Sequence, residues 1–260
     1  MKLKMFQVDA FSEHVFGGNP AAVCPLEAWL DDSMLQAIAE ENNLSETAFF
    51  VAKDGVFELR WFTPVEEVDL CGHATLATAH VIFTHLAFNE PEVVFQTRSG
   101  ELRVSRAESG YAMDFPGTLP NRTEAPQELT DGLGKPPEQV LAGFDYVVLY
   151  KSEDEIRSLS PDFEKLKDLS LRGVVVTAPG KNVDFVSRCF FPKLRVNEDP
   201  VTGSAHCELA PYWAGRLDKR KLSAEQLSQR GGSIECEVKG ERVVLIGRCA
   251  DFMSAEIQVA

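Results

Sequence analysis

The feature of this 260-residue chain that most constrains its fold is an internal repeat. Two alternating segments each end at a proline: FELRWFTP at 57–64 and FVSRCFFP at 185–192, which lie 128 positions apart. Alternation of this kind predicts a half-buried strand. Each segment is followed by an acid and a glycine turn, CGHA at 71–74 and TGSA at 202–205, 131 positions apart. The shared order predicts two similar halves with three extra residues in the second.

The same elements are predicted around each turn: a helix, an apolar strand, the alternating strand, the turn and a second helix. In the first half the helix, strand and second helix fall at 31–42, 48–51 and 73–86, and in the second half at 161–169, 173–177 and 204–216. The second helix of each half is apolar on most faces, which is typical of a helix enclosed by a sheet. We therefore expect an α+β fold of two pseudo-twofold-related domains, each a curled mixed sheet around a central helix. A cleft is expected between them.

The domain boundary is predicted near residue 118, which gives an N-terminal domain at 1–118 and a C-terminal domain at 119–260. The last strand of the sequence can belong either to the C-terminal domain or, by returning, to the N-terminal domain. The segment 121–137 is rich in Pro, Glu, Thr and Gly, and it is the expected linker between the halves.

The charge and composition of the chain argue against some partners and some cellular locations. The chain has 26 basic and 40 acidic residues, a net charge of −14, which repels nucleic acid and anionic membranes. No segment approaches the ~18 apolar residues of a membrane span, and the N-terminus lacks the apolar run of a signal peptide. The six cysteines form no CxxC pair and mostly sit in apolar runs, so we expect reduced thiols, a cytoplasmic location and no structural zinc.

The two glycine turns are candidate anion sites. Gly72 and Gly203 each precede a predicted helix, whose free N–H groups and dipole suit a carboxylate or a developing enolate. The alternative is that both glycines only permit tight connections. Polar neighbours at both turns, His73 and Asp199, favour the functional interpretation.

Three titratable residues are candidates for the chemistry. Glu46 stands at the start of an apolar strand, where lost hydration is expected to raise its pKa above about 4.3 and make it a proton donor; the alternative is a solvated or capping residue. His73 is expected to be neutral, because a helix N-terminus disfavours its cation. Asp199 is expected either to fix the tautomer of a histidine or to bind a substrate amine.

Other candidates have structural explanations. His73, His80 and His85 are spaced by seven and five residues, not as an i, i+4 ligand pair, and no acid lies among them. We therefore expect no metal site, and packed or surface roles for His80, His85 and His206. The segment 17–20 is expected to be a turn before a strand rather than a phosphate loop, and Arg230 lies in a predicted turn as a candidate for contact with substrate.

Five motifs occur together, at 7–11 (QVDAF), 17–23 (GGNPAAV), 43–47 (NLSET), 71–75 (CGHAT) and 199–205 (DPVTGSA). In this order they resemble the phenazine-biosynthesis-like (PhzF) isomerase family over essentially the whole chain. The resemblance implies a diaminopimelate-epimerase-like fold, commonly a homodimer, and an active site in the interdomain cleft that needs no cofactor.

The resemblance also implies roles for individual residues. Glu46 would move a proton between carbons of a cyclic, carboxylate-bearing diene, while His73, Asp199 and Ser204 complete the polar site. Gly203 would bind the substrate carboxylate through its N–H. Further substrate contacts are expected from the two turns and the loop that borders the site in the family, at Gly72, Thr202 and Asn19.

Departures from the family leave the substrate open. Cys71 and Ala74 flank the Gly-His pair, where the family's phenazine enzyme has alanine and proline, so we do not expect a phenazine pathway. Related epimerases keep a catalytic thiol at the position of Cys71 and a second thiol on the opposite face. The repeat pairs Cys71 with Thr202, and a helix would turn Cys207 inward. We predict a proton-shifting isomerase; the alternatives are a Cys71-dependent amino-acid racemase and a non-catalytic binding protein.

Overall fold

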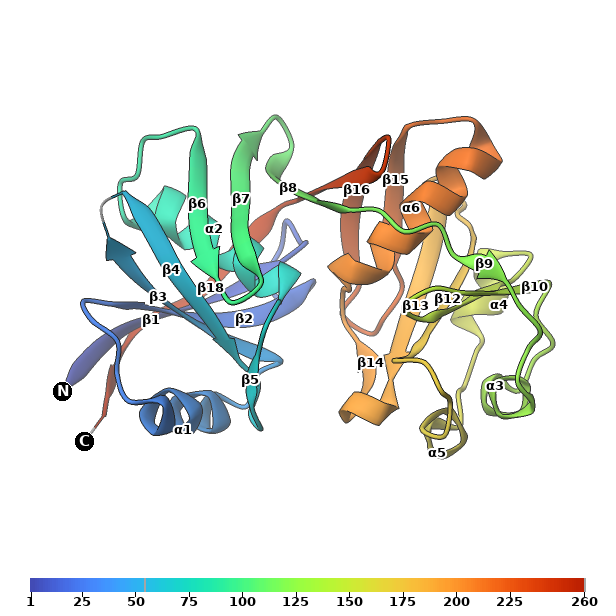
Figure 1. The fold of residues 1–260 in the computed structure, drawn as a ribbon, viewed down its shortest axis with the longest axis horizontal. Helices are drawn as coiled ribbons and strands as arrows, with labels where there is room; N and C mark the ends of the chain where they lie inside the picture. The colour runs from blue at the N-terminus through green and yellow to red at the C-terminus, as the bar shows by residue number, and fades with distance from the viewer. Residues whose placement is uncertain (54, 260) are drawn as a thin grey trace. The chain divides into compact units, whose positions relative to one another are not determined.

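The computed structural model describes residues 1–53 and 55–259, and the chain forms two compact units (Figure 1). The first unit comprises Met1–Asp114 and Ile246–Ala260, and the second comprises Phe115–Leu245. The last strand, β18 (Cys249–Gln258), therefore belongs to the first unit. None of the helices in these residues has the length and hydrophobicity needed to cross a membrane.

The described part of the first unit is a mixed sheet with two helices. Its other elements are β1 (Lys2–Ala10), β2 (Asn19–Leu26), α1 (Asp32–Asn42), β3 (Glu46–Lys53), β4 (Val56–Phe62), β5 (Glu67–Val68), α2 (Gly72–His85), β6 (Glu92–Thr97), β7 (Gly100–Ala107) and β8 (Gly110–Pro116). β1 pairs antiparallel with β18 and β2, and β2 pairs parallel with β3. β4 is antiparallel to β3 and β5 but parallel to β6, which continues into the antiparallel strands β7 and β8.

The second unit repeats this arrangement. Its elements are β9 (Asn121–Arg122), α3 (Gln127–Leu133), β10 (Gln139–Ala142), β11 (Tyr146–Leu149), α4 (Glu153–Arg157), α5 (Phe163–Leu166), β12 (Val174–Pro179), β13 (Phe185–Phe191), η1 (Pro192–Leu194), β14 (Val196–Asp199), α6 (Gly203–Leu217), β15 (Lys221–Gln226), β16 (Gly232–Lys239) and β17 (Arg242–Gly247). β13 is antiparallel to β12 and β14 and parallel to β15, as β4 is to β3, β5 and β6. The repeat in the sequence is thus a repeat of strand pairing.

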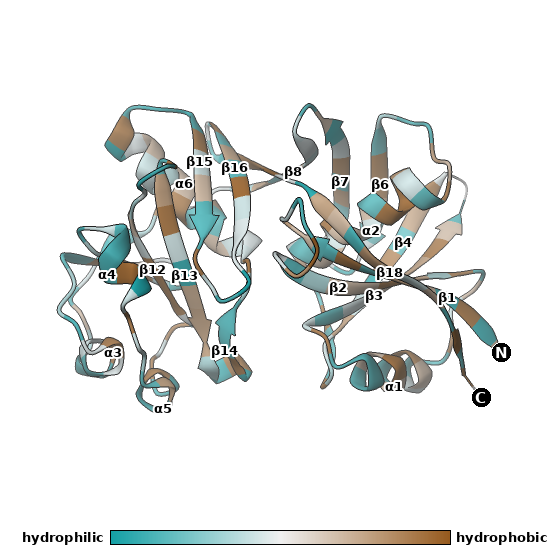
Figure 2. Cartoon of the chain, turned by 180° about the vertical axis from the view of Figure 1, so that it is seen from behind, coloured by the Kyte–Doolittle hydropathy of each residue, from teal (hydrophilic) through white to brown (hydrophobic). Residues whose placement is uncertain are grey.

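The central helix of each unit packs against the sheet. In α2 every residue from His73 to Phe83 is buried, and the helix contacts β1, β2, β3 and β18. The corresponding helix α6 contacts β15 and β16. Brown and teal bands alternate along several of the strands in Figure 2, as expected when one face of a strand is buried and the other is not.

Two expectations about local structure are wrong. The segment 121–137 is not a linker, because it contains β9 and α3 within the second unit, and Leu129 and Leu133 are buried in that unit's core. Its proline and glycine instead mark the ends of α3, where Gly134 takes the left-handed conformation (φ 68°). The predicted helix at 161–169 is limited to α5, because the backbone continues in tighter turns after Leu166.

Candidate active site

An arginine on the alternating strand of each unit holds the acid that precedes the glycine turn. Arg60 donates from Nε and Nη2 to the two oxygens of Glu67, both at 2.7 Å. Arg188 donates from the same atoms to Glu198 at 2.7 and 3.0 Å. Bidentate arginine–carboxylate pairs fix geometry as well as charge. In both units, therefore, the same kind of arginine–glutamate pair restrains the chain between the alternating strand and the glycine turn.

In the first unit, one imidazole lies between a carboxylate and a thiol. Glu46 is the first residue of β3, Cys71 immediately precedes α2, and His73 is the second residue of that helix. His73 Nε2 lies 3.1 Å from Glu46 Oε2, and His73 Nδ1 lies 3.5 Å from Cys71 Sγ. The side chains of His73 and Glu46 are only 8% and 18% exposed, so this contact is shielded from solvent. Packing of α2 against β3 thus joins residues that are 27 positions apart in the sequence.

The contact reverses the protonation states expected from the sequence. Burial raises the pKa of Glu46, but the charge of His73 and contacts with His73 and Cys71 outweigh burial and leave this pKa below its ordinary value. Burial lowers the pKa of His73, but Cys71 and Glu46 raise it well above the ordinary value. The resting pair is therefore carboxylate and imidazolium. The expected raised pKa of Glu46 and the expected neutral His73 are both wrong, because each residue was considered without its partner.

The two facing atoms of the Glu46–His73 ion pair can still form hydrogen bonds with a ligand. Glu46 Oε2 and His73 Nε2 are buried, and although they lie at ion-pair distance, neither is aligned for a hydrogen bond with any partner in residues 1–53 and 55–259. A buried polar atom without such a bond is costly unless another group uses it. A ligand that reaches these two atoms would supply the missing bonds.

Cys71 is a protonated thiol in this arrangement. Burial raises its pKa, the charge of Glu46 raises it further, and the lowering by His73 does not compensate. A thiol reacts as a base or nucleophile mainly through its thiolate. Cys71 therefore does not start as the reactive group, although its sulfur contacts the imidazole.

The three residues are also within reach of one ion, since one ligand atom of each lies within 4.8 Å of the others. However, His73 faces Cys71 with Nδ1 and Glu46 with Nε2. A metal ion bonds to one imidazole nitrogen. An ion at Nε2 could also bind Glu46 but not Cys71, and an ion at Nδ1 could bind Cys71 but not Glu46. The arrangement suits proton transfer better than metal binding.

The loop at 17–20 lies beside Glu46, because β2 and β3 are parallel and Ala21 is opposite Glu46. Asn19 is fully buried, and its Oδ1 accepts a hydrogen bond of 3.2 Å from Ser45 Oγ. Asn43 ends α1 in the left-handed conformation (φ 48°), which asparagine tolerates, and this turns the chain into the Ser-Glu-Thr segment. Asn19 thus supports the backbone next to Glu46.

In the second unit, Asp199 and Thr202 are joined by a residue that the sequence does not single out. Thr202 Oγ1 donates to Asp199 Oδ2. Gln226, at the end of β15, accepts the Thr202 N–H at 2.9 Å and donates to the Asp199 carbonyl at 2.7 Å. His206 Nδ1 bonds to the Thr202 carbonyl at 2.8 Å, and its Nε2 has no hydrogen-bond partner among the residues that the structure describes, so Asp199 does not set the tautomer of His206. Gln226 was missed because only strand pairing brings it to the turn.

Ser204 belongs to a second group of charged residues. Its Oγ accepts a hydrogen bond of 3.0 Å from Arg172 Nη2, and Arg172 also binds both oxygens of the fully buried Asp145, at 3.0 and 2.5 Å. Glu208 lies one turn further along α6, where burial and the charge of Asp145 raise its pKa to about 7. These partners come from three separate segments, and no local pattern marks them.

Neither turn glycine is required by the protein's own packing. A Cβ added at Gly72 would meet no atom within 4 Å, and one added at Gly203 would meet only Leu245 Cδ1, at 3.6 Å. Neither residue is in the left-handed region, and neither helix has a side-chain hydrogen bond that caps its N-terminus. Space beside free N–H groups is what an approaching anion needs. These observations favour ligand binding over the alternative that the glycines only permit tight connections.

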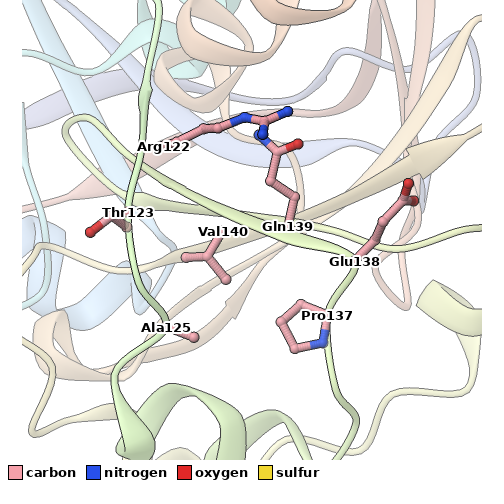
Figure 3. A pocket seen from close by; sticks show the side chains of 7 residues that line it. All are labelled: Arg122, Thr123, Ala125, Pro137, Glu138, Gln139 and Val140. Atoms are coloured by element: carbon pink, nitrogen blue, oxygen red, sulfur yellow. The ribbon is translucent and has the colours of Figure 1, made fainter.

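A depression of about 350 Å³ in the second unit is separate from these residues (Figure 3). It is lined by Arg122, Thr123, Ala125, Pro137, Glu138, Gln139 and Val140. Figure 3 shows the Arg122 guanidinium beside the Gln139 amide, with apolar side chains below them. No residue of the candidate site lines this depression, so we assign it no part in the chemistry.

Comparison with known proteins identifies the family. The model of the phenazine biosynthesis-like protein family matches residues 8–255. The chain belongs to this PhzF family. An uncharacterized isomerase of Pseudomonas aeruginosa is 57% identical to it over 100% of both chains. The crystal structure of a PhzF-family protein from Enterococcus faecalis is 50% identical, with a TM-score of 0.98 over 100% of both chains.

The PhzF fold extends to more distant proteins. A hydroxyproline epimerase from Agrobacterium vitis has a TM-score of 0.62 at 9% identity, over 98% of this chain and 92% of that chain, which shows a shared fold alone. The family resemblance and the α+β fold predicted from the sequence are therefore confirmed. With its PhzF relatives named isomerases, the chain is an enzyme of the isomerase class.

Within this PhzF-family protein, the predicted site residues form two groups. Glu46 and His73 meet beside Gly72 in the first unit, with Asn19 behind them. In the second unit, residues Asp199 and 202–204 surround the start of α6. That the two groups act on one substrate stays a prediction.

Proposed function

We propose that this PhzF-family isomerase shifts a proton between two carbons of a small, carboxylate-bearing substrate, without a cofactor and with both units contributing. The buried Glu46–His73 ion pair is the observation that carries the proposal. It places a base and a proton donor 3.1 Å apart, and both facing atoms lack a hydrogen bond. Acid–base pairs held in this way accelerate proton transfer by about 10²- to 10⁴-fold.

The protonation states set the order of events. Glu46 begins as the carboxylate and removes a proton from a carbon made acidic by conjugation with the substrate carboxylate. The electron pair of the broken C–H bond moves into the conjugated system, and the His73 imidazolium stabilises the resulting negative charge. Glu46, now protonated, returns the same proton at a second carbon and regains its charge. One carboxyl group serves both steps because its two oxygens reach different carbons of the same face.

The substrate carboxylate would bind the N–H groups of Gly203 and Ser204 at the start of α6, which no side chain caps and where the helix dipole favours an anion. The N–H of Gly72 would offer a similar anion site at the start of α2. Thr202 shapes the turn through its bond to Asp199, whose negative charge suits a substrate amine. A homodimer and a cytoplasmic location belong to the same proposal, supported by the family resemblance and the free cysteines.

Substrate identity and reaction type can be tested together. A small molecule that co-purifies with the protein is identified by mass and then incubated with the enzyme in D₂O. We expect an isomer in which a double bond has moved, with at most one deuterium at the new C–H position. Recovery of the unchanged molecule without deuterium after prolonged incubation would contradict the proposal and favour a binding protein.

A racemase that uses Cys71 is the second candidate, because the sulfur contacts the same imidazole at 3.5 Å. The D₂O experiment separates the two. A racemase inverts a stereocentre and introduces deuterium there, and the Cys71→Ser enzyme is then inactive. In the proposed isomerase, the Cys71→Ser enzyme keeps most of its activity, because Glu46 moves the proton.

The glycine of the second turn provides a sharp prediction about binding. Gly203→Ala is expected to weaken binding of the co-purified carboxylate by about tenfold or more, because the methyl group fills space at the start of α6 that is open in the wild type. Stability should not fall, since alanine is the better helix former by about 0.5–1 kcal/mol in a helix interior. Calorimetric titration and thermal unfolding measure the two effects.

Gly215→Ala is the matched control, because Gly215 lies in the same helix and an added Cβ there also meets nothing within 4 Å. It should leave binding unchanged. Equal binding by both variants would place the carboxylate elsewhere.

A further inference from the structure

Two histidines of α2 share one carboxylate oxygen of β18, away from the Glu46–His73 pair. His80 Nε2 lies 3.1 Å from Asp251 Oδ1, and His85 Nε2 lies 3.0 Å from the same atom. His80 is seven residues beyond His73, which is about 10 Å along a helix. No acid lies between these histidines in the sequence, and the acid that meets them, Asp251, comes from β18 near the other end of the sequence.

The spacing of these atoms matches a metal site. Zinc binds histidine nitrogen and aspartate oxygen at about 2.0–2.2 Å, so two ligands at the tetrahedral angle are about 3.3 Å apart. The two histidine–aspartate distances of 3.1 and 3.0 Å are a few tenths of an ångström shorter. One ligand atom of each of the three residues lies within 4.8 Å of the others. A small outward movement of the side chains would admit the ion.

Neighbouring groups orient both rings. His80 Nδ1 lies 3.0 Å from the Tyr111 hydroxyl, which is the kind of second bond that metal-binding histidines make with the nitrogen not used for the metal. Tyr111 is held in turn by stacking on Phe83, with ring centroids 5.4 Å apart. The ring of His85 stacks on Phe6, with centroids 4.7 Å apart. Both imidazoles therefore point Nε2 at the same place before any ion binds.

The group is open enough for an ion to enter. The side chain of His80 is 10% exposed, but those of His85 and Asp251 are 31% and 45% exposed. Solvent reaches the carboxylate, and a water molecule can complete the coordination. By contrast, the two other candidate ligands of the Glu46 cluster, Glu46 and Cys71, face different nitrogens of the His73 imidazole.

We propose that His80 Nε2, His85 Nε2 and the Asp251 carboxylate bind a zinc ion, with water as the fourth ligand. Two imidazoles and one carboxylate suit zinc and neighbouring transition metals, whereas magnesium and calcium prefer oxygen ligands alone. The ion would join the second half of α2 to the last strand, two segments more than 160 positions apart in the sequence. Its role is to cross-link α2 and β18 within the first unit.

Cobalt(II) is the probe that distinguishes this site from the cysteine-containing cluster. The protein of 260 residues, stripped of metal with a chelator, is titrated with Co²⁺ and followed by its visible absorption. We expect one equivalent to bind, with tetrahedral d–d bands, no sulfur-to-cobalt charge-transfer band, and displacement by Zn²⁺. A charge-transfer band that disappears in Cys71→Ser would overturn the assignment, as would the absence of binding.

Variants locate the ion. His85→Gln should abolish the cobalt bands and the rise in unfolding temperature caused by Zn²⁺, while its metal-free unfolding temperature shows whether it folds. Tyr111→Phe should weaken binding by about 10- to 100-fold through loss of the orienting bond. His14→Gln, which changes an exposed histidine outside the group, should bind like the wild type. Unchanged binding by His85→Gln would refute the proposal.

Discussion

Glu46→Gln is expected to lower kcat by about 10²- to 10⁴-fold while leaving substrate affinity within a few-fold of the wild type. Glutamine keeps the size of the side chain and its hydrogen-bonding oxygen, but it cannot take or return a proton. The measurement is the rate at which the co-purified substrate is converted to its isomer, with the dissociation constant determined separately. Glu41→Gln, which changes an exposed acid on α1, is the control and should keep full activity.

The same substitution should change the pH dependence through His73. In the wild type, the pKa of Glu46 is lowered, so its carboxylate contributes stability above its unfolded pKa of about 4.3 and loses it as pH falls through the folded value. The pKa of His73 is raised, so its contribution is present below about 6.5 and is lost as pH rises through the folded value. Activity should therefore be level through neutral pH and fall on the alkaline side as His73 loses its proton.

In Glu46→Gln, the burial that lowers the pKa of His73 remains while one charge that raises it is gone. Imidazole NMR signals should then show His73 losing its proton at lower pH than in the wild type. A His73 titration that does not move would mean that the Glu46–His73 ion pair does not exist in solution.

Arg172→Leu is expected to destabilise the second unit by about 3 kcal/mol, the lower end of the range for breaking a buried ion pair. The substitution leaves Asp145, which is fully buried, without the two hydrogen bonds from Arg172, and the nearby Glu208 adds further negative charge. The lower end applies because Arg172 itself is 37% exposed and partly screened by water. Urea unfolding gives the free energy.

Two variants check this explanation. Lys167→Leu breaks the exposed ion pair with Glu164 and should cost less than about 1 kcal/mol. The double variant Arg172→Leu with Asp145→Leu removes both charges and should be more stable than Arg172→Leu alone, because no unpaired charge stays buried. A double variant that is less stable than the single one would show that shape, not charge, causes the effect.

Much of the fold was predictable because the signals are local. The alternating segments became β4 and β13, and the two apolar segments after the turns became α2 and α6, within one residue of the expected limits. The repeat itself was visible because both copies keep their order and spacing. The limits of α3 were not predictable from composition, since proline and glycine are common both in linkers and at helix ends.

The candidate site was only partly predictable. Glu46, His73 and Asp199 stand next to turns that a local pattern marks. Gln226, Arg172 and Asp251 carry no such mark, and each joins a group only because strands or helices far apart in the sequence pack together. Single-sequence patterns cannot report such pairings.

By itself, the sequence of this protein determined the duplicated α+β plan, the two glycine turns and the family, because periodicity and motif order are properties of neighbouring residues. Only the tertiary structure decided which groups carry charge. The protonation of Glu46 and His73 depends on a 3.1 Å contact between two elements and on their burial, and electrostatic energy depends on distance and solvent exclusion rather than on position in the chain.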